Sequence, residues 1–358
     1  MPSPSLSLSQ PAADLLSSMS FHNTPELAEL PGHGPNGLVR LPEQLRDQLN
    51  NRARFISMDS VGCEVRFVCE SANIDVFIST TKPEFGDQSE IRIFRGNIEV
   101  ARHLQAPGTV QHYRLGDPPN FKLVDRGKLQ QGGFADIVYR VCFNRGGTAH
   151  LHGIVTFGYP IRPPKPEELP RVKWLAYGSS ITNSSLDGYP HTAARLLKLD
   201  VQNKGLSGSC HCEPEIADWL AEQAEWDLIT CEMGINMRGG FSAEEFEKRV
   251  TYLLTRLTDA HPDKPVIAID VFPNFYTEGW VNKEHHAHPD AQRERDYIRI
   301  VGEVVAALDH PNLHHIPGNE IVDDFTYLGG DLLHPGEYGQ MMMGARLAEK
   351  LRPIVQTL

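Results

Sequence analysis

The sequence has no long apolar segment and no excess of basic residues. No stretch reaches the ~18 consecutive apolar residues that a membrane-spanning helix requires, so we expect no membrane-embedded segment. Lys and Arg number 34 against 46 Asp and Glu, which gives a formal net charge of −12. Because nucleic acids and anionic membrane surfaces attract clustered Lys and Arg, this balance predicts neither kind of partner.

Cysteine is scarce, and its spacing includes no C-x-x-C pair. Six cysteines in 358 residues do not make a disulfide framework, and we interpret them as small buried side chains in a reducing compartment. The first twenty residues lack both the basic part and the continuous apolar part of a secretory signal. We therefore expect a cytoplasmic protein.

The length predicts about two domains, and the composition changes along the chain. Residues 1–40 are rich in Ser, Pro and Gly, which is typical of a loose arm. Within this arm Gly32, Gly34 and Gly37 match G-x-G-x-x-G. No buried strand precedes them and Pro35 removes an amide, so we do not interpret the match as a dinucleotide-binding loop.

Between about residues 54 and 157 the hydrophobic pattern has the period of two that is typical of strands. β-Branched and aromatic residues occupy short runs separated by Gly, Pro, Asn and Asp. Short strands without a long helical segment predict an all-β sandwich or jelly roll over residues 41–158. Five prolines between residues 159 and 170 then indicate a stiff linker over residues 159–171.

Residues 172–358 alternate between predicted strands and predicted helices. The strand candidates are each followed by a helical pattern, and they cover residues 172–177, 201–204, 228–233, 265–272 and 312–316. This alternation predicts a three-layer α/β domain with a parallel sheet between helices. In such sheets reactive side chains lie on the loops beyond the carboxyl ends of the strands.

Four of these loops contain residues suited to nucleophilic catalysis. Ser180 lies in the turn between a predicted strand and a predicted helix, where the positive end of the coming helix would stabilise an alkoxide-like oxygen, although serine is also a common helix N-cap. Gly208 and Asn236 could donate N–H groups to an oxyanion, although both residue types are common in turns. Asp331 could hold Nδ1–H of His334 and leave Nε2 as a base, although an N-capping Asp beside a surface His would look the same.

The order of these residues along successive strand ends resembles that of the SGNH (GDSL) hydrolase family. The resemblance covers residues ~172–352 and implies a flavodoxin-like order of strands and helices. It implies that Ser180 is the nucleophile and that Asp331 and His334 complete a catalytic triad. It also implies an oxyanion hole formed by the amides of Ser180 and Gly208 and the side chain of Asn236.

Two neighbours of Ser180 distinguish this sequence from related patterns. Ser179 stands where the SGNH family usually has Asp, a position outside the triad. Thr182 occupies the position at which the G-x-S-x-G motif of α/β-hydrolases requires glycine, so that template does not fit.

A sandwich that precedes an SGNH domain is similar to the arrangement in family 2 carbohydrate acetyl esterases. The resemblance implies a serine esterase without cofactor that removes acetyl groups, through an acyl-enzyme, from an oligosaccharide or another small-molecule ester. The alternatives are a short-chain carboxylesterase or lysophospholipase-type acylhydrolase on a non-sugar substrate, and an inactive saccharide-binding relative. The sandwich could also form the interface of a homo-oligomer.

Further polar and aromatic residues lie near the predicted site. Arg238 and Trp280 are candidates to shape the substrate site, and the alternative for both is loop packing. The Cys-His-Cys segment 210–212 and the His-rich segment 285–288 could be read as metal ligands. Adjacent side chains of the first segment point apart and no second ligand pair is present, so we expect no metal.

Overall fold

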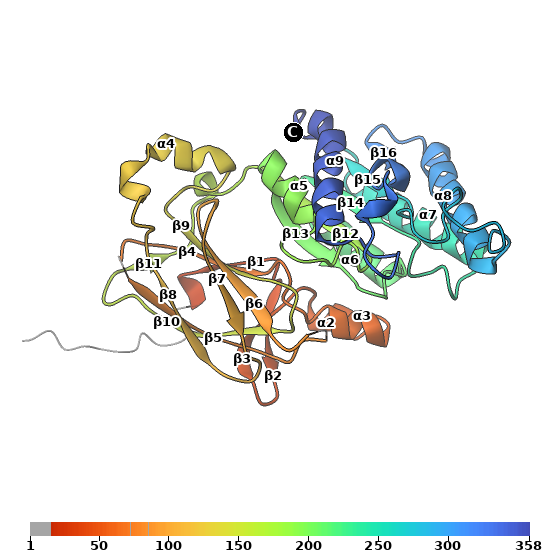
Figure 1. Cartoon of the computed structure of the whole chain (residues 1–358). Coiled ribbons are helices and arrows are strands. Elements are labelled where there is room, and N and C mark those ends of the chain that lie inside the picture. The colour runs from red at the N-terminus through yellow and green to blue at the C-terminus, as the bar shows by residue number, and fades with distance from the viewer. Residues whose placement is uncertain (1–15, 72, 85) are drawn as a thin grey trace, which may run out of the picture. The chain divides into compact units, whose positions relative to one another are not determined.

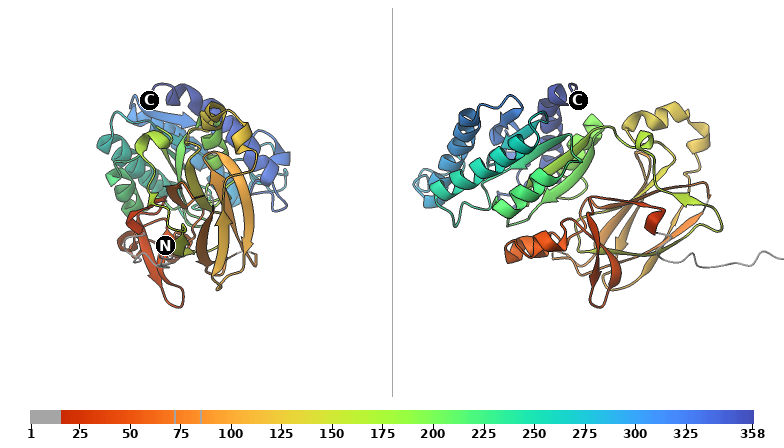
Figure 2. Two further views of the ribbon diagram at one scale, coloured as in Figure 1. Left: turned by 90° about the vertical axis from the view of Figure 1, so that its left-hand side faces the viewer. Right: turned by 180° about the vertical axis from the view of Figure 1, so that it is seen from behind.

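The computed structural model describes residues 16–71, 73–84 and 86–358, which are shown in Figures 1 and 2. The chain divides into two compact units. The β-sandwich unit comprises the residues up to Arg40 together with Met58–Arg171, and the α/β unit comprises Leu41–Ser57 and Val172–Leu358.

The β-sandwich unit contains two antiparallel sheets. One has the strand order β1-β4-β9-β6-β7 with β11 beside β4, and the other has the order β2-β3-β10-β5-β8. The strands are β1 (Ser20–His22), β2 (Glu26–Leu30), β3 (Gly34–Val39), β4 (Glu64–Cys69), β5 (Ile74–Thr80), β6 (Ser89–Arg95), β7 (Ile98–Gln105), β8 (Gln111–Leu115), β9 (Val138–Phe143), β10 (Ala149–Val155) and β11 (Ile161–Arg162). Helical turns are η1 (Phe121–Leu123), α4 (Arg126–Leu129), η2 (Gln130–Gly132) and η3 (Pro166–Glu168).

The core of this unit consists of alternate residues from strands of both sheets. Val65 and Phe67 of β4 and Val76 and Ile78 of β5 are completely buried in one apolar cluster. Side chains two apart on a strand point to the same face, so the period of two in the sequence produces this core. The prediction of an antiparallel β-rich region is confirmed.

The part of the predicted loose arm that the structure describes contains strands β1, β2 and β3, while residues 1–15 lie outside the described residues. Gly32 and Gly34 have φ of +78° and +81° and turn the chain between β2 and β3. Gly37 is the partner of His150 on β10. The G-x-G-x-x-G match is therefore a β-hairpin, and the glycine content that suggested a loose arm comes from its turn.

The proline-rich segment predicted as a linker packs with the β-sandwich unit. Its strand β11 pairs with β4, and Arg162 forms a two-hydrogen-bond ion pair with Glu168 at 2.7 and 2.8 Å. β11 itself contains no proline, because Pro160 and Pro163 lie on either side of it, so both of its residues keep an N–H to donate.

The α/β unit has a parallel sheet with the strand order β13-β12-β14-β15-β16, which is the predicted flavodoxin-like order. Its strands are β12 (Lys173–Gly178), β13 (Asp200–Gly205), β14 (Leu228–Glu232), β15 (Val266–Ile269) and β16 (Leu313–Ile316). Its helices are α2 (Glu43–Arg46), α3 (Asn51–Ile56), α5 (Tyr189–Leu197), α6 (Pro214–Glu222), α7 (Ala243–Ala260), α8 (Pro289–Leu308) and α9 (Glu337–Val355), with short turns η4 (Gly318–Glu320) and η5 (Phe325–Tyr327).

Helices cover both faces of this sheet, as Figures 1 and 2 show. On β12, Trp174 and Ala176 face a cluster formed with α5 and α9, whereas Leu175 and Tyr177 face a cluster formed with α6, α7 and α8. A strand buried on both faces needs a nearly continuous apolar run, which is what residues 174–177 provide. The predicted three-layer fold is confirmed.

Residues 41–57, which we predicted as part of the sandwich, lie with the α/β unit. Their apolar residues recur almost every four positions, and Leu45, Leu49, Ala53 and Ile56 are buried in the cluster that contains α6 and α7. Leu45 lies on α2, Leu49 in the turn that follows it, and Ala53 and Ile56 on α3. The described residues include no helix that is long and apolar enough to cross a membrane.

We predict that Ile56→Ala destabilises the α/β unit by about 2–5 kcal/mol, because it leaves a cavity in the core. Trp174, Trp219, Trp226 and Trp280 are the tryptophans of the chain and all belong to the α/β unit, so their fluorescence during urea unfolding reports on that unit. The exposed Arg54→Ala change on the same helix is the control and should stay within about 0.5 kcal/mol. Equal midpoints for wild type and Ile56→Ala would contradict the placement of this segment.

Candidate active site

The loops beyond β12 and β16 bring Ser180, His334 and Asp331 together. The Ser180 Oγ lies 2.7 Å from His334 Nε2, and His334 Nδ1 lies 2.6 Å from Asp331 Oδ2. With the ring proton on Nδ1, His334 donates to the carboxylate and Nε2 accepts from the serine hydroxyl. This is the arrangement in which a histidine can remove the serine proton.

The Asp331 carboxylate is held by its own turn. Its Oδ1 accepts hydrogen bonds from the backbone N–H groups of Leu333 at 3.0 Å and His334 at 2.9 Å. Partial burial alone would raise the pKa of Asp331, but the hydrogen bonds from the His334 ring and from these two amides outweigh it and lower the pKa. Asp331 is therefore kept as an anion beside the imidazole.

The turn that presents Ser180 lies over a buried carboxyl group. The Ser179 N–H donates to Glu232 Oε2 at 2.6 Å, and the Thr182 hydroxyl donates to the same oxygen at 3.1 Å. Glu232 is completely buried at the end of β14. Burial raises the pKa of Glu232, and the hydrogen bonds from Ser179 and Thr182 offset this only in part.

Sequence reasoning did not find Glu232 as a site residue. The available signal is a charged residue in the otherwise apolar run Leu228–Met233, because a strand buried on both faces rarely contains a carboxylate without a partner. Its partners are backbone and hydroxyl groups of the serine turn, and those contacts are visible only in the folded chain.

The predicted oxyanion donors are the N–H groups of Ser180 and Gly208 and the side chain of Asn236. Among the residues that the structure describes, neither the Ser180 N–H nor the Gly208 N–H donates to an acceptor. Gly208 is exposed and has a φ of +70°, a conformation that glycine adopts without strain. Asn236 Oδ1 accepts from the Cys210 N–H at 3.1 Å, which leaves its Nδ2 as the donating side.

Arg238 and Trp280 contact neighbouring loop residues. Arg238 is nearly buried, and its Nη1 donates to Glu294 at 2.5 Å and to Asn274 at 2.9 Å. The Trp280 ring meets Phe325 edge to face at 5.3 Å. These contacts are those of loop packing, and a part in shaping the substrate site stays a prediction.

The two segments considered as metal ligands have other contacts. Cys210 and Cys212 are buried, and His288 caps the start of α8 and stacks on Tyr276 at 4.7 Å. Within residues 16–71, 73–84 and 86–358, no three His, Cys, Asp or Glu side chains gather as ligands of one metal ion.

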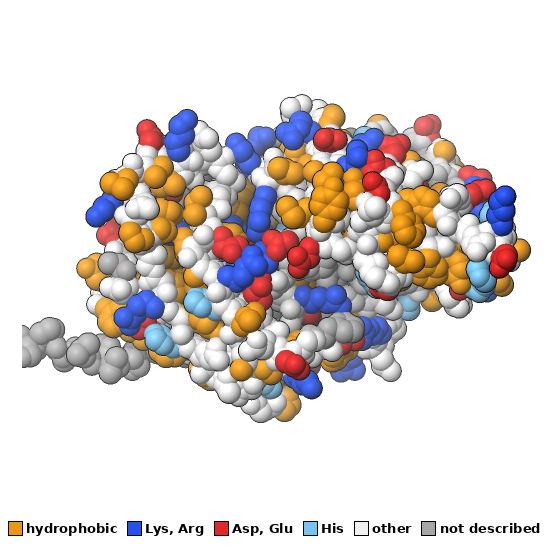
Figure 3. Space-filling view, in the orientation of Figure 1, with side chains coloured by type: hydrophobic (Ala, Val, Ile, Leu, Met, Phe, Trp, Pro, Cys, Tyr) orange, Lys and Arg blue, Asp and Glu red, His pale blue; other side chains and the backbone are white. Residues whose placement is uncertain are grey.

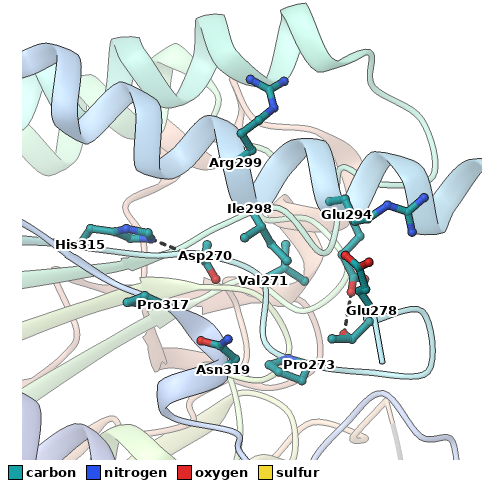
Figure 4. A pocket seen from close by; sticks show the side chains of 12 residues that line it. Asp270, Val271, Pro273, Glu278, Glu294, Ile298, Arg299, His315, Pro317 and Asn319 are labelled. Atoms are coloured by element: carbon teal, nitrogen blue, oxygen red, sulfur yellow. Dashed lines mark hydrogen bonds and ion pairs between the residues drawn. The ribbon is translucent and has the colours of Figure 1, made fainter. Parts of the chain in front are cut away.

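A separate cavity of about 390 Å³ lies between α8 and the ends of β15 and β16 (Figure 4). Figure 4 shows Asp270 and His315 directed toward each other, with 2.8 Å between Oδ2 and Nε2. Asp270 Oδ1 also accepts from the Gly318 N–H at 2.7 Å. None of the residues Ser180, His334 and Asp331 lines this cavity, and the Asp270–His315 pair ties the chain directly after β15 to β16.

We predict that Glu232→Gln reduces the pH dependence of stability. Because its pKa is raised in the folded chain, Glu232 contributes stability that is fully present below the ordinary value of 4.5 and is lost as the pH rises through the raised value. Gln does not ionise, so the stability of the variant should fall less over this range. Tryptophan-monitored urea unfolding at a series of pH values measures the difference, and parallel curves for both proteins would contradict the assignment.

The fold is shared with solved structures that cover both units. Salicylyl-acyltransferase SsfX3 from a tetracycline biosynthetic pathway is 14% identical, with a TM-score of 0.76 over 94% of this chain and 95% of that one. A family two carbohydrate esterase from Cellvibrio japonicus is 13% identical, with a TM-score of 0.60 over 95% and 96%. One from Clostridium thermocellum in complex with cellohexaose is 13% identical, with a TM-score of 0.58 over 84% and 94%.

The sequence itself is distant from characterised relatives. No curated protein sequence matches the chain. Residues 173–356, however, match the sequence profile of one family, and this match covers every residue of the predicted site from Ser180 to His334. The chain therefore belongs to the GDSL-like lipase/acylhydrolase family and is an ester-bond hydrolase.

Proposed function

We propose that the chain is a serine esterase in which Ser180, His334 and Asp331 form the catalytic triad. The observation that carries this proposal is the continuous pair of hydrogen bonds, 2.7 Å from Ser180 to His334 and 2.6 Å from His334 to Asp331. An inactive relative would have no need to keep this geometry together with the N–H groups of Ser180 and Gly208, which donate to no acceptor within the described residues.

The reaction has two stages. His334 Nε2 takes the hydroxyl proton as Ser180 Oγ attacks the ester carbonyl carbon, and the tetrahedral intermediate forms. The bond to the alcohol oxygen then breaks, and His334 gives its proton to the departing alcohol. Water attacks the resulting acyl-enzyme with His334 again as the base, and collapse of the second intermediate releases the carboxylic acid and restores Ser180.

The negative charge of both tetrahedral intermediates would be bound by the oxyanion donors. These are the N–H groups of Ser180 and Gly208 and the Nδ2 of Asn236, whose amide orientation is set by the bond that its Oδ1 accepts from Cys210. Deletions of single donors in other enzymes suggest that each contributes about 3 kcal/mol of transition-state stabilisation. Asp331 stabilises the imidazolium that forms at each proton transfer.

The proposed substrate is a short-chain ester, with an acetyl group on a carbohydrate preferred. The similarity to two family two carbohydrate esterases supports it, because it extends over the sandwich as well as the α/β unit. No loop beyond the sheet is a continuous run of Leu, Ile or Phe that would suit a long acyl chain.

A second candidate substrate is an ester of an apolar, non-sugar group. Leu332 lies between Asp331 and His334 in the chain and is 39% exposed, and Tyr338 and Met341 on α9 are more exposed still. Figure 3 shows apolar side chains gathered on the surface of the α/β unit around α9. The similar fold of a salicylyl-acyltransferase is compatible with such a substrate.

Ser180→Ala should abolish hydrolysis of p-nitrophenyl acetate, because the nucleophilic oxygen is lost while the amide of residue 180 remains. Release of p-nitrophenol measures the activity, and tryptophan-monitored unfolding confirms that the variant is folded. A folded Ser180→Ala protein with near-wild-type activity would exclude Ser180 as the nucleophile.

A panel of esters should separate the two substrate candidates. We expect the highest kcat/KM on acetylated sugars, with activity that falls as the acyl chain lengthens. Mass-spectrometric detection of released acetate follows the sugar esters, and p-nitrophenyl esters of increasing length follow the acyl preference. A preference for long or aromatic esters would reject the carbohydrate proposal in favour of the second candidate.

A further inference from the structure

The segment Leu41–Ser57 brings an arginine to the loop that contains Gly208. Asn50 is the N-cap of helix α3, and its Oδ1 accepts from the Ala53 N–H at 2.9 Å. The Asn50 Nδ2 donates to Glu213 Oε1 at 2.5 Å, which ties the start of α3 to the chain after β13. These contacts orient the first turn of α3, which carries Arg52.

Arg52 contacts the peptide group that supplies the Gly208 amide. Its Nε–H donates to the Ser207 carbonyl oxygen at 3.2 Å. A Cβ added to Gly208 would lie 3.5 Å from the same nitrogen, so the guanidinium lies directly beside the glycine. The contact lies wholly within the α/β unit, although Arg52 and Ser207 are 155 residues apart in the chain.

This carbonyl and the proposed oxyanion donor belong to one rigid unit. A peptide bond is planar and trans, so the Ser207 C=O and the Gly208 N–H point in opposite directions. A donor bound to the oxygen therefore fixes the direction of the N–H. A cationic donor also draws electron density toward the oxygen, which makes the N–H on the other side a stronger donor.

Other contacts hold the rest of this loop, and the Ser209 hydroxyl donates to the Ser207 carbonyl oxygen at 3.4 Å, a longer contact than that from Arg52. The Leu206 N–H donates to the Gly178 carbonyl at 2.7 Å, and Asn183 Nδ2 donates to the Ser207 hydroxyl at 2.8 Å. Gly208 itself has a positive φ and, with no Cβ, has many backbone conformations within reach. Of these two contacts to the Ser207 oxygen, the bond from Arg52 is the shorter and comes from a cation, so it contributes to the orientation of the Gly208 amide.

We propose that Arg52 is a positioning residue of the oxyanion hole, which holds and polarises the Ser207–Gly208 peptide group so that the Gly208 N–H binds the oxyanion. This inference rests on the proposed function, because it requires Gly208 to be an oxyanion donor. Since the charge on the substrate oxygen develops in the transition state, the loss of Arg52 should lower kcat more than it raises KM.

The test compares Arg52→Met with Arg54→Met in the full-length protein. Methionine keeps an apolar stem and removes the donor, and Arg54 is an exposed neighbour on α3 that pairs with Asp47 at 2.8 Å. For p-nitrophenyl acetate, we expect kcat of Arg52→Met to fall about tenfold with KM within about twofold, less than the loss of a whole oxyanion donor. Arg54→Met should retain wild-type kcat.

Two further measurements separate positioning from a structural role. Arg52→Lys, which restores a cationic donor, or methylguanidinium added to Arg52→Met should recover part of the lost kcat. Phenylboronic acid, which forms a tetrahedral adduct with an active serine, should bind Arg52→Met more weakly by the same factor as kcat falls. If Arg52→Met folds poorly, the same kcat and boronate measurements on Arg52→Gln replace it, with the same expected losses.

Wild-type kcat in a folded Arg52→Met protein, or unchanged boronate affinity, would overturn the inference. So would a loss of activity that only follows the unfolded fraction measured by tryptophan fluorescence. These results differ from a failure of the proposed function, in which Ser180→Ala keeps its activity whatever happens at Arg52.

Discussion

The register of the parallel sheet is the constraint on which the site depends. Gly178 at the end of β12 is paired with Gly205 of β13, and Tyr177 is paired with Cys231 of β14, which places Glu232 level with Gly178. The loops that carry Ser180, Gly208 and Asn236 therefore start at one edge of the sheet. A Cβ on Gly178 would collide with Thr182 and Glu232, so glycine lets the serine turn close over the carboxyl group.

Buried hydrogen bonds to Glu232 hold the turn that contains Ser180, whereas the turn with Asp331 and His334 lies nearer to solvent. Glu232 is completely buried, but the side chains of His334 and Asp331 are 44% and 53% exposed. The base of the proposed mechanism must accept and return protons, so it needs contact with substrate and water. Hydrogen bonds within the turn keep Asp331 in place despite its exposure. The serine turn is thus held in place by burial of its contacts, and the Asp331 side chain is held by hydrogen bonds within its own turn.

The sequence predicted the fold class. It also predicted those site residues that are marked by a local sequence pattern. Asp331 and His334 are three positions apart in one turn, and Ser180, Gly208 and Asn236 each follow a recognisable strand. Glu232 and Arg52 were not predicted as site residues because their partners are distant in the chain. Ser179 is 53 positions from Glu232, and Ser207 is 155 positions from Arg52. The strands of residues 20–39 were not predicted because the glycines of their turn suggested an irregular segment. Pairing with β4 and β10 outweighs this local preference for irregular structure.

Residues 41–57 also show that the α/β unit includes more of the chain than the family match does. That match begins at residue 173, yet the α/β core includes Leu45, Leu49 and Ile56 from a segment that precedes most of the sandwich. The chain therefore enters the α/β unit, returns to the sandwich and enters the α/β unit again. A fragment that starts at the proline-rich segment would lack these apolar side chains and the arginine beside Gly208, so the segment Leu41–Ser57 is part of what builds the α/β core.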